Sequence, residues 1–472
     1  MQTVAAVTTT GIYCRPGCAA RPHSRNVLTY PSAAAAESAG FRACLRCRPY
    51  RSPVSVPWTG PELVCRAVRL ILSGALDDGG EADLAARLGV SARHLRRLFT
   101  THLGVTPDGL ARSARVHFAR RLLDDTDLTI TEVAYAAGFG SLRQFNRVCI
   151  DVFRASPREL RRRRRKADRL IADGGLALRL LFRGPMDWDA MFAYFAARAI
   201  PGVEHVEDGI YRRTVLIDGD PGVLELGPGG DDHLILRAHL PHWESLTHIA
   251  DRARRIANLD MDASEPVARL TRDPLIGPLV TAGPGLRPPG TWDPFEVGVR
   301  AILDHRAPHT DTNALMRQLV AHLGDPVPGL AQLGLCATFP SAQTLAVADL
   351  TNLNISQVRA DAVRSFARAV ADHAIRLDRS VSLDELLSAI TSVGGVEPQV
   401  AHYIAFRLGE PDAWPISIDT LDRALEGMAR RHTPPYELVD RWRPWRALAV
   451  THLWRAAEPE PEPEQTPVAH AV

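Results

Sequence analysis

Two cysteine-containing stretches determine how the first part of the chain folds: Gly11-Ile-Tyr-Cys14-Arg-Pro-Gly-Cys18 and Cys44-Leu-Arg-Cys47. Four of the seven cysteines lie here, in two close pairs separated by 25 residues. Two thiols on each of two short loops can close a tetrahedral four-cysteine zinc site. On spacing alone, a purely structural zinc site is as well supported as a reactive one.

Composition and charge narrow the class of protein. The 472 residues are 46% hydrophobic and 23% charged, which predicts a globular chain of about three domains. The sequence has neither a long apolar run nor a charged-then-apolar leader, so we expect a cytoplasmic, nucleoid-associated protein. Disulfides are rare there, and paired cysteines favour metal binding or reactive thiolates. The net charge is +14 over residues 1–166 and −12 over the remainder, which indicates nucleic-acid binding by the first third.

Arginines surround the two cysteine pairs. This segment contains seven arginines and a single acidic residue, Glu37. The arginines are Arg15, Arg21, Arg25, Arg42, Arg46, Arg48 and Arg51. Such a field suits a phosphate backbone. The segments 9–18 and 39–49 resemble the N-terminal methyl-acceptor domain of the Ada family. The resemblance implies that Cys14, Cys18, Cys44 and Cys47 hold Zn²⁺, and that Cys14 takes a methyl group from a DNA methylphosphotriester in a single turnover.

Residues 61–165 show helical periodicity with a repeated pattern. Leu84 to Leu88, the turn 89–91 and Leu95 to Phe99 predict a helix, a tight turn and a second helix, with Ser91 as the N-cap. The pattern recurs at 130–148, after a long apolar helix at 111–123. Two such helix-turn-helix units in one chain resemble the AraC family of transcription regulators. The resemblance implies an activator, with RNA polymerase as a partner.

The second helix of each unit is expected in the major groove of double-stranded DNA. Arginine can read guanine, and glutamine or asparagine can read adenine. The side chains that face the DNA would be Arg93, His94, Arg96 and Arg97 in the first unit, and Arg143, Gln144, Asn146 and Arg147 in the second. For any one of them, a phosphate contact or a solvated helix face is an equal alternative. Two units in one chain make a monomer sufficient.

The rest of the chain predicts an α+β region followed by a helical one. Alternating strands at 176–182, 211–217, 223–226 and 233–240, with helices at 188–198 and 246–259, indicate an α+β subdomain over 170–290. Residues 291–457 are mostly helical, and the Glu-Pro alternation of 458–472 predicts a disordered acidic tail. We therefore expect a multidomain, mainly α protein with α+β parts: a zinc domain (1–52), a double helix-turn-helix domain (61–165), the α+β subdomain and a final helical domain.

Residues 178–455 resemble the alkylpurine (AlkA-type) DNA glycosylases of the helix-hairpin-helix superfamily. The resemblance rests on motifs in the family's order: Phe195-Ala-Ala-Arg198, Pro284-Gly-Leu-Arg287, Val299-Arg300-Ala-Ile-Leu303, Ser392 to Arg407, Trp442-Arg-Pro-Trp445-Arg446 and His452-Leu-Trp454. By position, Asp419 matches the catalytic aspartate, Tyr194, Tyr403 and Trp454 match the aromatics that line the base pocket, and Arg306 matches the wedge that replaces the flipped base. The chain's only lysine is Lys166, so excision would be monofunctional.

Three departures keep a second interpretation open. Glu397 stands where the hairpin usually has glycine, Gln399 replaces a tryptophan, and Arg306 replaces an apolar wedge. The leading hypothesis is an adaptive-response protein, in which a zinc-cysteine methyl acceptor and transcriptional activator is fused to a glycosylase that excises alkylated purines of the 3-methyladenine type. The alternative is a zinc-dependent regulator whose C-terminal region binds DNA without excision.

Overall fold

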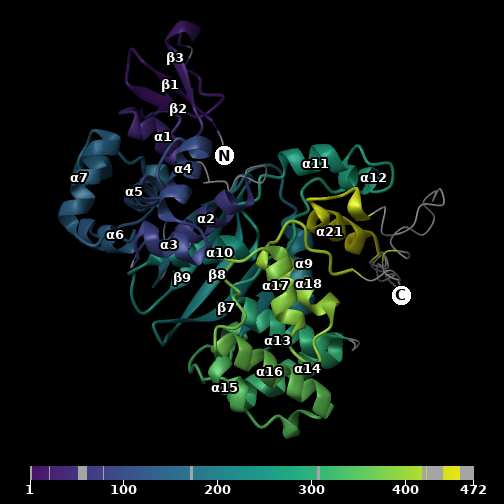
Figure 1. Cartoon of the computed structure of the whole chain (residues 1–472). Coiled ribbons are helices and arrows are strands. Elements are labelled where there is room, and N and C mark those ends of the chain that lie inside the picture. Colours follow the sequence, from purple (N-terminus) through teal and green to yellow (C-terminus); the bar gives the residue numbers. More distant parts are fainter. Residues whose placement is uncertain are drawn as a thin grey trace, which may run out of the picture.

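The computed structural model describes residues 3–20, 22–51, 61–77, 79–170, 174–305, 309–416, 421 and 439–457. Figure 1 shows the strands of the cysteine-rich segment at one end, helices α2 to α7 next to them, and helices α13 to α18 at the opposite end. An antiparallel sheet lies between the two sets of helices. No helix among the described residues is long and apolar enough to cross a membrane. The predicted tail, 458–472, lies outside the described residues.

The cysteine-rich segment folds as a small four-stranded sheet. Its strands are β1 (Val4–Val7), β2 (Ile12–Cys14), β3 (Val27–Tyr30) and β4 (Arg42–Ala43), in the order β3-β1-β2-β4, and helix α1 (Ala33–Ser38) follows β3. Gly11 makes the turn between β1 and β2 with a positive φ of 63°. Strands β2 and β4 run parallel, with Tyr13 opposite Ala43. The two cysteine pairs therefore follow neighbouring strand ends.

Seven helices form the next module: α2 (Glu62–Leu72), α3 (Glu81–Arg87), α4 (Ala92–Leu103), α5 (Pro107–Asp125), α6 (Ile130–Ala136), α7 (Leu142–Phe153) and α8 (Pro157–Arg162). The predicted N-cap Ser91 is confirmed, and Ser141 caps the corresponding helix of the second unit. Ser91 accepts a hydrogen bond from the His94 N–H, and Ser141 accepts one from the Gln144 N–H. Both α4 and α7 end at a residue with positive φ, Gly104 and Arg154. The pairs α3–α4 and α6–α7 are thus two copies of one local structure.

The α+β region is a five-stranded antiparallel sheet in the order β5-β9-β8-β7-β6. Its elements are β5 (Leu176–Leu181), α9 (Trp188–Arg198), β6 (Glu204–Glu207), β7 (Ile210–Ile217), β8 (Asp220–Gly230), β9 (His233–His239) and α10 (Leu246–Ile256). Strand β6 was not expected, because Glu-His-Val-Glu has no apolar alternation. It is an edge strand that pairs only with β7.

The helical region contains α11 (Ser264–Leu270), α12 (Gly277–Ala282), α13 (Pro294–Asp304), α14 (His309–Leu323), α15 (Ala342–Val347), α16 (Gln357–Ala371), α17 (Leu383–Thr391), α18 (Pro398–Leu408) and α21 (Arg446–Ala457). Helix α13 is its buried centre. A Cβ at Gly298 would lie 2.4 Å from the Phe366 ring, so glycine is what lets α13 approach α16. Helix α15 follows Phe339-Pro-Ser341, and Ser341 is its N-cap.

The hydrophobic cores do not follow the module boundaries. One core fills the helical region, and another surrounds the first helix-turn-helix unit. The remaining core is continuous from Val4 and Tyr50 through Phe153 of α7 to Leu178 of β5. The cysteine-rich sheet, the second helix-turn-helix unit and the antiparallel sheet therefore share buried apolar surface, which stabilises their relative placement.

Candidate functional site

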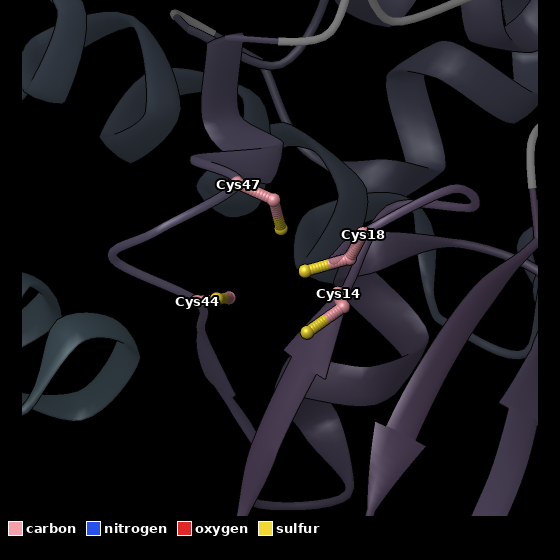
Figure 2. A group of neighbouring side chains, drawn as sticks. All are labelled: Cys14, Cys18, Cys44 and Cys47. Atoms are coloured by element: carbon pink, nitrogen blue, oxygen red, sulfur yellow. The ribbon is translucent and has the colours of Figure 1, made fainter. Parts of the chain in front are cut away.

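The four cysteines Cys14, Cys18, Cys44 and Cys47 converge on one point. Their sulfur atoms all lie within 4.8 Å of one another, and Figure 2 shows them directed toward a common centre. Parallel pairing brings Cys14, at the end of β2, beside Cys44, whose N–H donates to the Tyr13 carbonyl at 3.0 Å. The predicted grouping of these thiols is confirmed.

The sulfur cluster fits zinc. Tetrahedral ligands at the usual Zn–S distance of about 2.3 Å would place the sulfurs about 3.8 Å apart. Burial and the neighbouring Cys44 and Cys47 raise the pKa of the Cys14 thiol well above its usual range. Without a cation, such a thiol stays protonated. Zinc offsets both effects, because it binds thiolates and neutralises their mutual repulsion.

A buried polar network joins the cysteine-rich sheet to helix α5. The Tyr13 O–H donates to Glu37 at 2.5 Å, and the Glu37 carboxylate lies 2.6 Å from Nε2 of His117 on α5. All three side chains are almost fully buried. Although burial by itself would raise the pKa of Glu37, His117, Tyr13 and Ser113 together lower it. Tyr13 precedes Cys14, so this network lies one residue from the cysteine cluster.

The arginine field is only partly available to a DNA backbone. Arg48 pairs with Asp168 at 2.6 Å, and Arg51 pairs with Asp125 at 2.8 Å and Asp124 at 3.3 Å. These contacts attach the cysteine-rich sheet to the next module. Arg15, Arg25 and Arg46 are exposed, whereas Arg21 lies outside the described residues. The single acid of the field, Glu37, is buried at the junction with α5.

The predicted DNA-reading residues lie on α4 and α7, the second helix of each unit. Those that are exposed are Arg93, Arg96, Arg97, Arg143, Gln144 and Arg147. Arg96 is also paired with Glu81 of α3 at 2.6 Å. Asn146 is half-buried, and its amide donates to the Leu142 carbonyl in its own helix at 2.8 Å. His94 lies 3.0 Å from an Arg97 nitrogen.

Three aromatic residues predicted to line a base pocket come together from three helices. Tyr194 of α9 and Tyr403 of α18 share a hydrogen bond between their hydroxyls at 2.8 Å. The ring of Trp454, on α21, lies 6.3 Å from that of Tyr403. Each of the three side chains is half-buried. These residues are 209 and 51 positions apart in the sequence, so only the fold makes them neighbours.

Two arginines beside this cluster were missed from the sequence. The Arg198 guanidinium lies 4.1 Å from the Tyr194 ring centre, and that of Arg407 lies 5.3 Å from it. Arg407 also donates to the Tyr403 hydroxyl at 3.2 Å. Burial alone would raise the pKa of Tyr403, but Arg407 and Arg198 lower it. Both arginines end motifs that the family resemblance uses, which was the available signal for their importance.

The predicted hairpin lies between α17 and α18. Gly395 has a positive φ of 84°, and its Cβ would meet Ala362 at 3.0 Å, so glycine is required there. Glu397 lies 3.0 Å from Nε2 of His305, at the end of α13. Gln399 is exposed and donates to the Pro415 carbonyl at 3.2 Å. Asp419 and Arg306, the predicted catalytic aspartate and wedge, lie outside the described residues.

Comparison with known proteins accounts for this combination of modules. Residues 2–50 match the family described as the metal binding domain of Ada, residues 84–163 a helix-turn-helix domain, and residues 177–293 the AlkA N-terminal domain. A protein of Mycobacterium tuberculosis, named "probable bifunctional transcriptional activator/DNA repair enzyme AlkA", is 38% identical over 96% of this chain and 93% of its own length. The chain belongs to this family of bifunctional activator and repair enzymes.

Two further relatives are similar to the C-terminal part. DNA-3-methyladenine glycosylase 2 of Escherichia coli is 27% identical over 58% of this chain and 95% of its own length. The solved structure of a 3-methyladenine DNA-glycosylase from Archaeoglobus fulgidus superposes with a TM-score of 0.50 at 17% identity, over 58% of this chain and 96% of that one, and supports the fold alone.

Family membership establishes the general activity. The chain joins a DNA-binding transcriptional activator to a DNA repair enzyme, and its four-cysteine domain binds Zn²⁺. The predicted combination of a zinc domain, helix-turn-helix units and a glycosylase-like α+β and helical region is confirmed.

Proposed function

We propose that the chain repairs alkylated DNA by two reactions and couples one of them to transcription. The C-terminal region excises alkylated purines of the 3-methyladenine type by hydrolysing the N-glycosidic bond, without cutting the strand. The observation that carries this proposal is the meeting of Tyr194, Tyr403 and Trp454, with Tyr403 on α18, the helix that follows the hairpin. Such rings can enclose a base that has left the stack.

In this proposal the catalytic carboxylate is Asp419, which matches the family's catalytic aspartate by position. Methylation of a purine ring nitrogen makes the base cationic and a good leaving group, and the sugar passes through an oxocarbenium-like state. A carboxylate about 4 Å from that charge contributes about 4 kcal/mol at an effective dielectric near 20. This corresponds to about a thousandfold in rate. The same carboxylate orients the attacking water.

The aromatic cluster favours a cationic base over a neutral one, because ring faces attract cations. Arg198 already occupies one face of Tyr194, at 4.1 Å from the ring centre. In this proposal the base therefore stacks mainly against Tyr403 and Trp454. Tyr194 supports them through its hydrogen bond to Tyr403.

The second reaction takes place at Cys14. Zinc, when bound, keeps the cysteine thiols deprotonated. The Cys14 thiolate attacks the methyl carbon of a methylphosphotriester, so an S–C bond forms while the C–O bond breaks, and the phosphodiester leaves with the electron pair. The product is a neutral thioether. The cluster loses one negative charge, which weakens its repulsion of the DNA backbone.

This loss of charge supplies a signal for transcription. The cysteine-rich sheet is attached to α5 by Tyr13, Glu37 and His117, and α5 separates the two helix-turn-helix units. In the proposed activator, Arg93, Arg96, Arg97, Arg143, Gln144, Asn146 and Arg147 contact promoter DNA. The activator acts as a monomer in the cytoplasm, at the nucleoid, and recruits RNA polymerase.

Release of 3-methyladenine from methylated DNA tests the excision reaction. We expect release by the wild-type chain, a loss of about a thousandfold in Asp419→Asn, and unchanged release by Asp220→Asn, which alters an exposed carboxylate on β8. Equal release by wild type and Asp419→Asn, or release by neither, would refute the role of Asp419.

Transfer of an isotopically labelled methyl group tests the role of Cys14. Cys14 is 7% exposed, whereas Cys18 and Cys47 are half-buried and more accessible. We expect peptide mass mapping of the wild-type chain to find the label on Cys14 alone. Label on Cys18, or continued labelling of Cys14→Ala, would show that another thiol is the acceptor.

A zinc-dependent regulator that binds DNA without excision is the second candidate. The observation that favours it is the Glu397 carboxylate, which pairs with His305 at the hairpin. Hairpin backbone N–H groups bind a phosphate, and a carboxylate beside them opposes that contact. Under this alternative, methylated DNA binds to the chain but no base is released.

A further inference from the structure

A cleft lined by arginines lies where the three modules meet. Its volume is about 270 Å³, near the lower end of the range for small-molecule sites. Ser73 and Arg87 come from the helix-turn-helix module, Arg252 and Arg255 from α10 of the α+β region, and Arg379 and Arg407 from the helical region. None of these residues has a role in the reactions proposed above, except that Arg407 touches the aromatic cluster.

The charges that line the cleft are unbalanced. Five arginines face one acid, Asp378, and that acid is paired with Arg87 at 2.6 Å. Within the described part of the chain, no carboxylate oxygen lies within 4.0 Å of Arg252, Arg379 or Arg407. Their nitrogens donate instead to carbonyls, those of Trp292, Leu408 and Gly290 respectively.

The neighbouring acids pair with one cleft arginine, Arg255, and with two arginines outside the cleft. Asp251 lies 3.6 Å from Arg255, Glu296 binds Arg213 at 2.8 Å, and Glu410 lies 3.5 Å from Arg69. Burial, and after it the nearby Arg69 and Arg255, lower the pKa of Arg379 to about 9. Grouping cations away from water without counter-charges costs free energy, and a bound anion would offset that cost.

The cleft and the hairpin lie at opposite ends of helix α18. The hairpin lies at the N-terminal end of α18, whereas Arg407 and Leu408 lie at its C-terminal end. Ten residues of α-helix span about 15 Å. The cleft and the hairpin are therefore two distinct places on the chain, and competition with duplex DNA tests whether both can be occupied at once.

We propose that this cleft binds a small polyanion carrying two or more phosphoryl groups. Planar guanidinium groups bind phosphoryl oxygens in pairs, and Arg252 and Arg255 project from the same helix, three residues apart. Trp292, which lies 4.0 Å below the Arg252 guanidinium, holds that side chain in place. Because all three modules contribute arginines, the ligand would link them, and Arg407 would connect it to Tyr403.

Isothermal titration of the full-length, zinc-loaded chain tests the proposal, with inorganic pyrophosphate and ADP as separate probes. Sodium chloride of equal ionic strength is the reference, and zinc content is measured before and after. We expect a single site with a Kd below about 1 mM. Comparable binding of both probes identifies the phosphoryl groups as the recognised part, and much tighter binding of ADP identifies a nucleotide as the source.

Arg252→Gln should weaken binding about tenfold or more, because it removes a charge-assisted hydrogen bond donor. Arg252→Lys should weaken pyrophosphate binding less than Arg252→Gln does. Arg237→Gln removes an exposed arginine of β9 outside the cleft and should bind pyrophosphate as the wild type does. Pyrophosphate should also raise the melting temperature of the wild type more than that of Arg252→Gln. The proposal would be overturned if neither probe binds at about 10 mM, or if Arg237→Gln weakens binding as much as Arg252→Gln. It would also be overturned if duplex DNA displaces the bound pyrophosphate.

Discussion

The contact between Glu37 and helix α5 offers a sharp test of how the cysteine-rich sheet is held. Glu37→Gln keeps the shape of the side chain but removes its charge. In the structure, one oxygen of Glu37 accepts from Tyr13 at 2.5 Å and lies 2.6 Å from His117. A buried hydrogen bond to a charged group contributes about 1.5–3 kcal/mol, against about 1 kcal/mol for a neutral bond. We expect Glu37→Gln to lower the free energy of unfolding by about 2 kcal/mol.

Thermal unfolding of the zinc-loaded chain measures this loss. About 2 kcal/mol corresponds to a fall of about 4–8 °C in the melting temperature of a cooperative unit of 150–250 residues. The matched control is Glu207→Gln, since Glu207 is 60% exposed and lies 3.5 Å from His205. An exposed pair of this kind contributes little, so we expect a change of less than about 0.5 kcal/mol.

The pH dependence separates charge from shape. The folded-state pKa of Glu37 is lowered from its usual 4.5. Its stabilising contribution is therefore fully present above pH of about 4.5 and is lost as the pH falls through the folded-state value. The difference between wild type and Glu37→Gln should be largest near neutral pH and should shrink toward acid. If the variant unfolds like Glu207→Gln, or if the difference does not depend on pH, the reasoning is refuted.

Three further perturbations address the other parts of the chain. Removing zinc with a chelator should unfold the cysteine-rich sheet, since structural zinc contributes about 10–16 kcal/mol in small domains. Proteolytic cleavage confined to residues 1–51 would confirm this unfolding. Unchanged resistance of these residues to the protease would contradict it. Arg213→Met should lower the free energy of unfolding by about 3–5 kcal/mol, because Glu296 loses its buried partner. Urea denaturation measures this loss, with Arg237→Met as the control variant. Similar losses in the two variants would contradict the prediction. Trp454→Ala should slow 3-methyladenine release by about tenfold or more, and Tyr403→Phe, which keeps the ring, by less; equal effects in single-turnover assays would contradict stacking.

The local structure and several groupings of residues could be predicted from the sequence. The caps Ser91 and Ser141 act on N–H groups three residues later, so their signal is contained in a short stretch. The alternation of apolar and polar residues in β7 and the spacing within each cysteine pair are likewise signals contained in a short stretch of sequence. The grouping of Tyr194, Tyr403 and Trp454 was predicted only through the resemblance to a known family, and Asp419 stays a prediction.

The tertiary structure decided which charges face inward and which remain available. Composition alone gave Arg48 and Arg51 the same role as Arg15, yet their contacts to Asp168 and Asp125 fix them at a domain junction. The position of Glu37 against His117, 80 residues away, has no local signal either. The physical reason is that burial and ion pairing depend on distances through space, whereas propensity and capping depend on neighbours along the chain. The sequence by itself thus determined the four-cysteine site and the order of the modules along the chain. Only the packed structure showed how the four-cysteine site is held against α5.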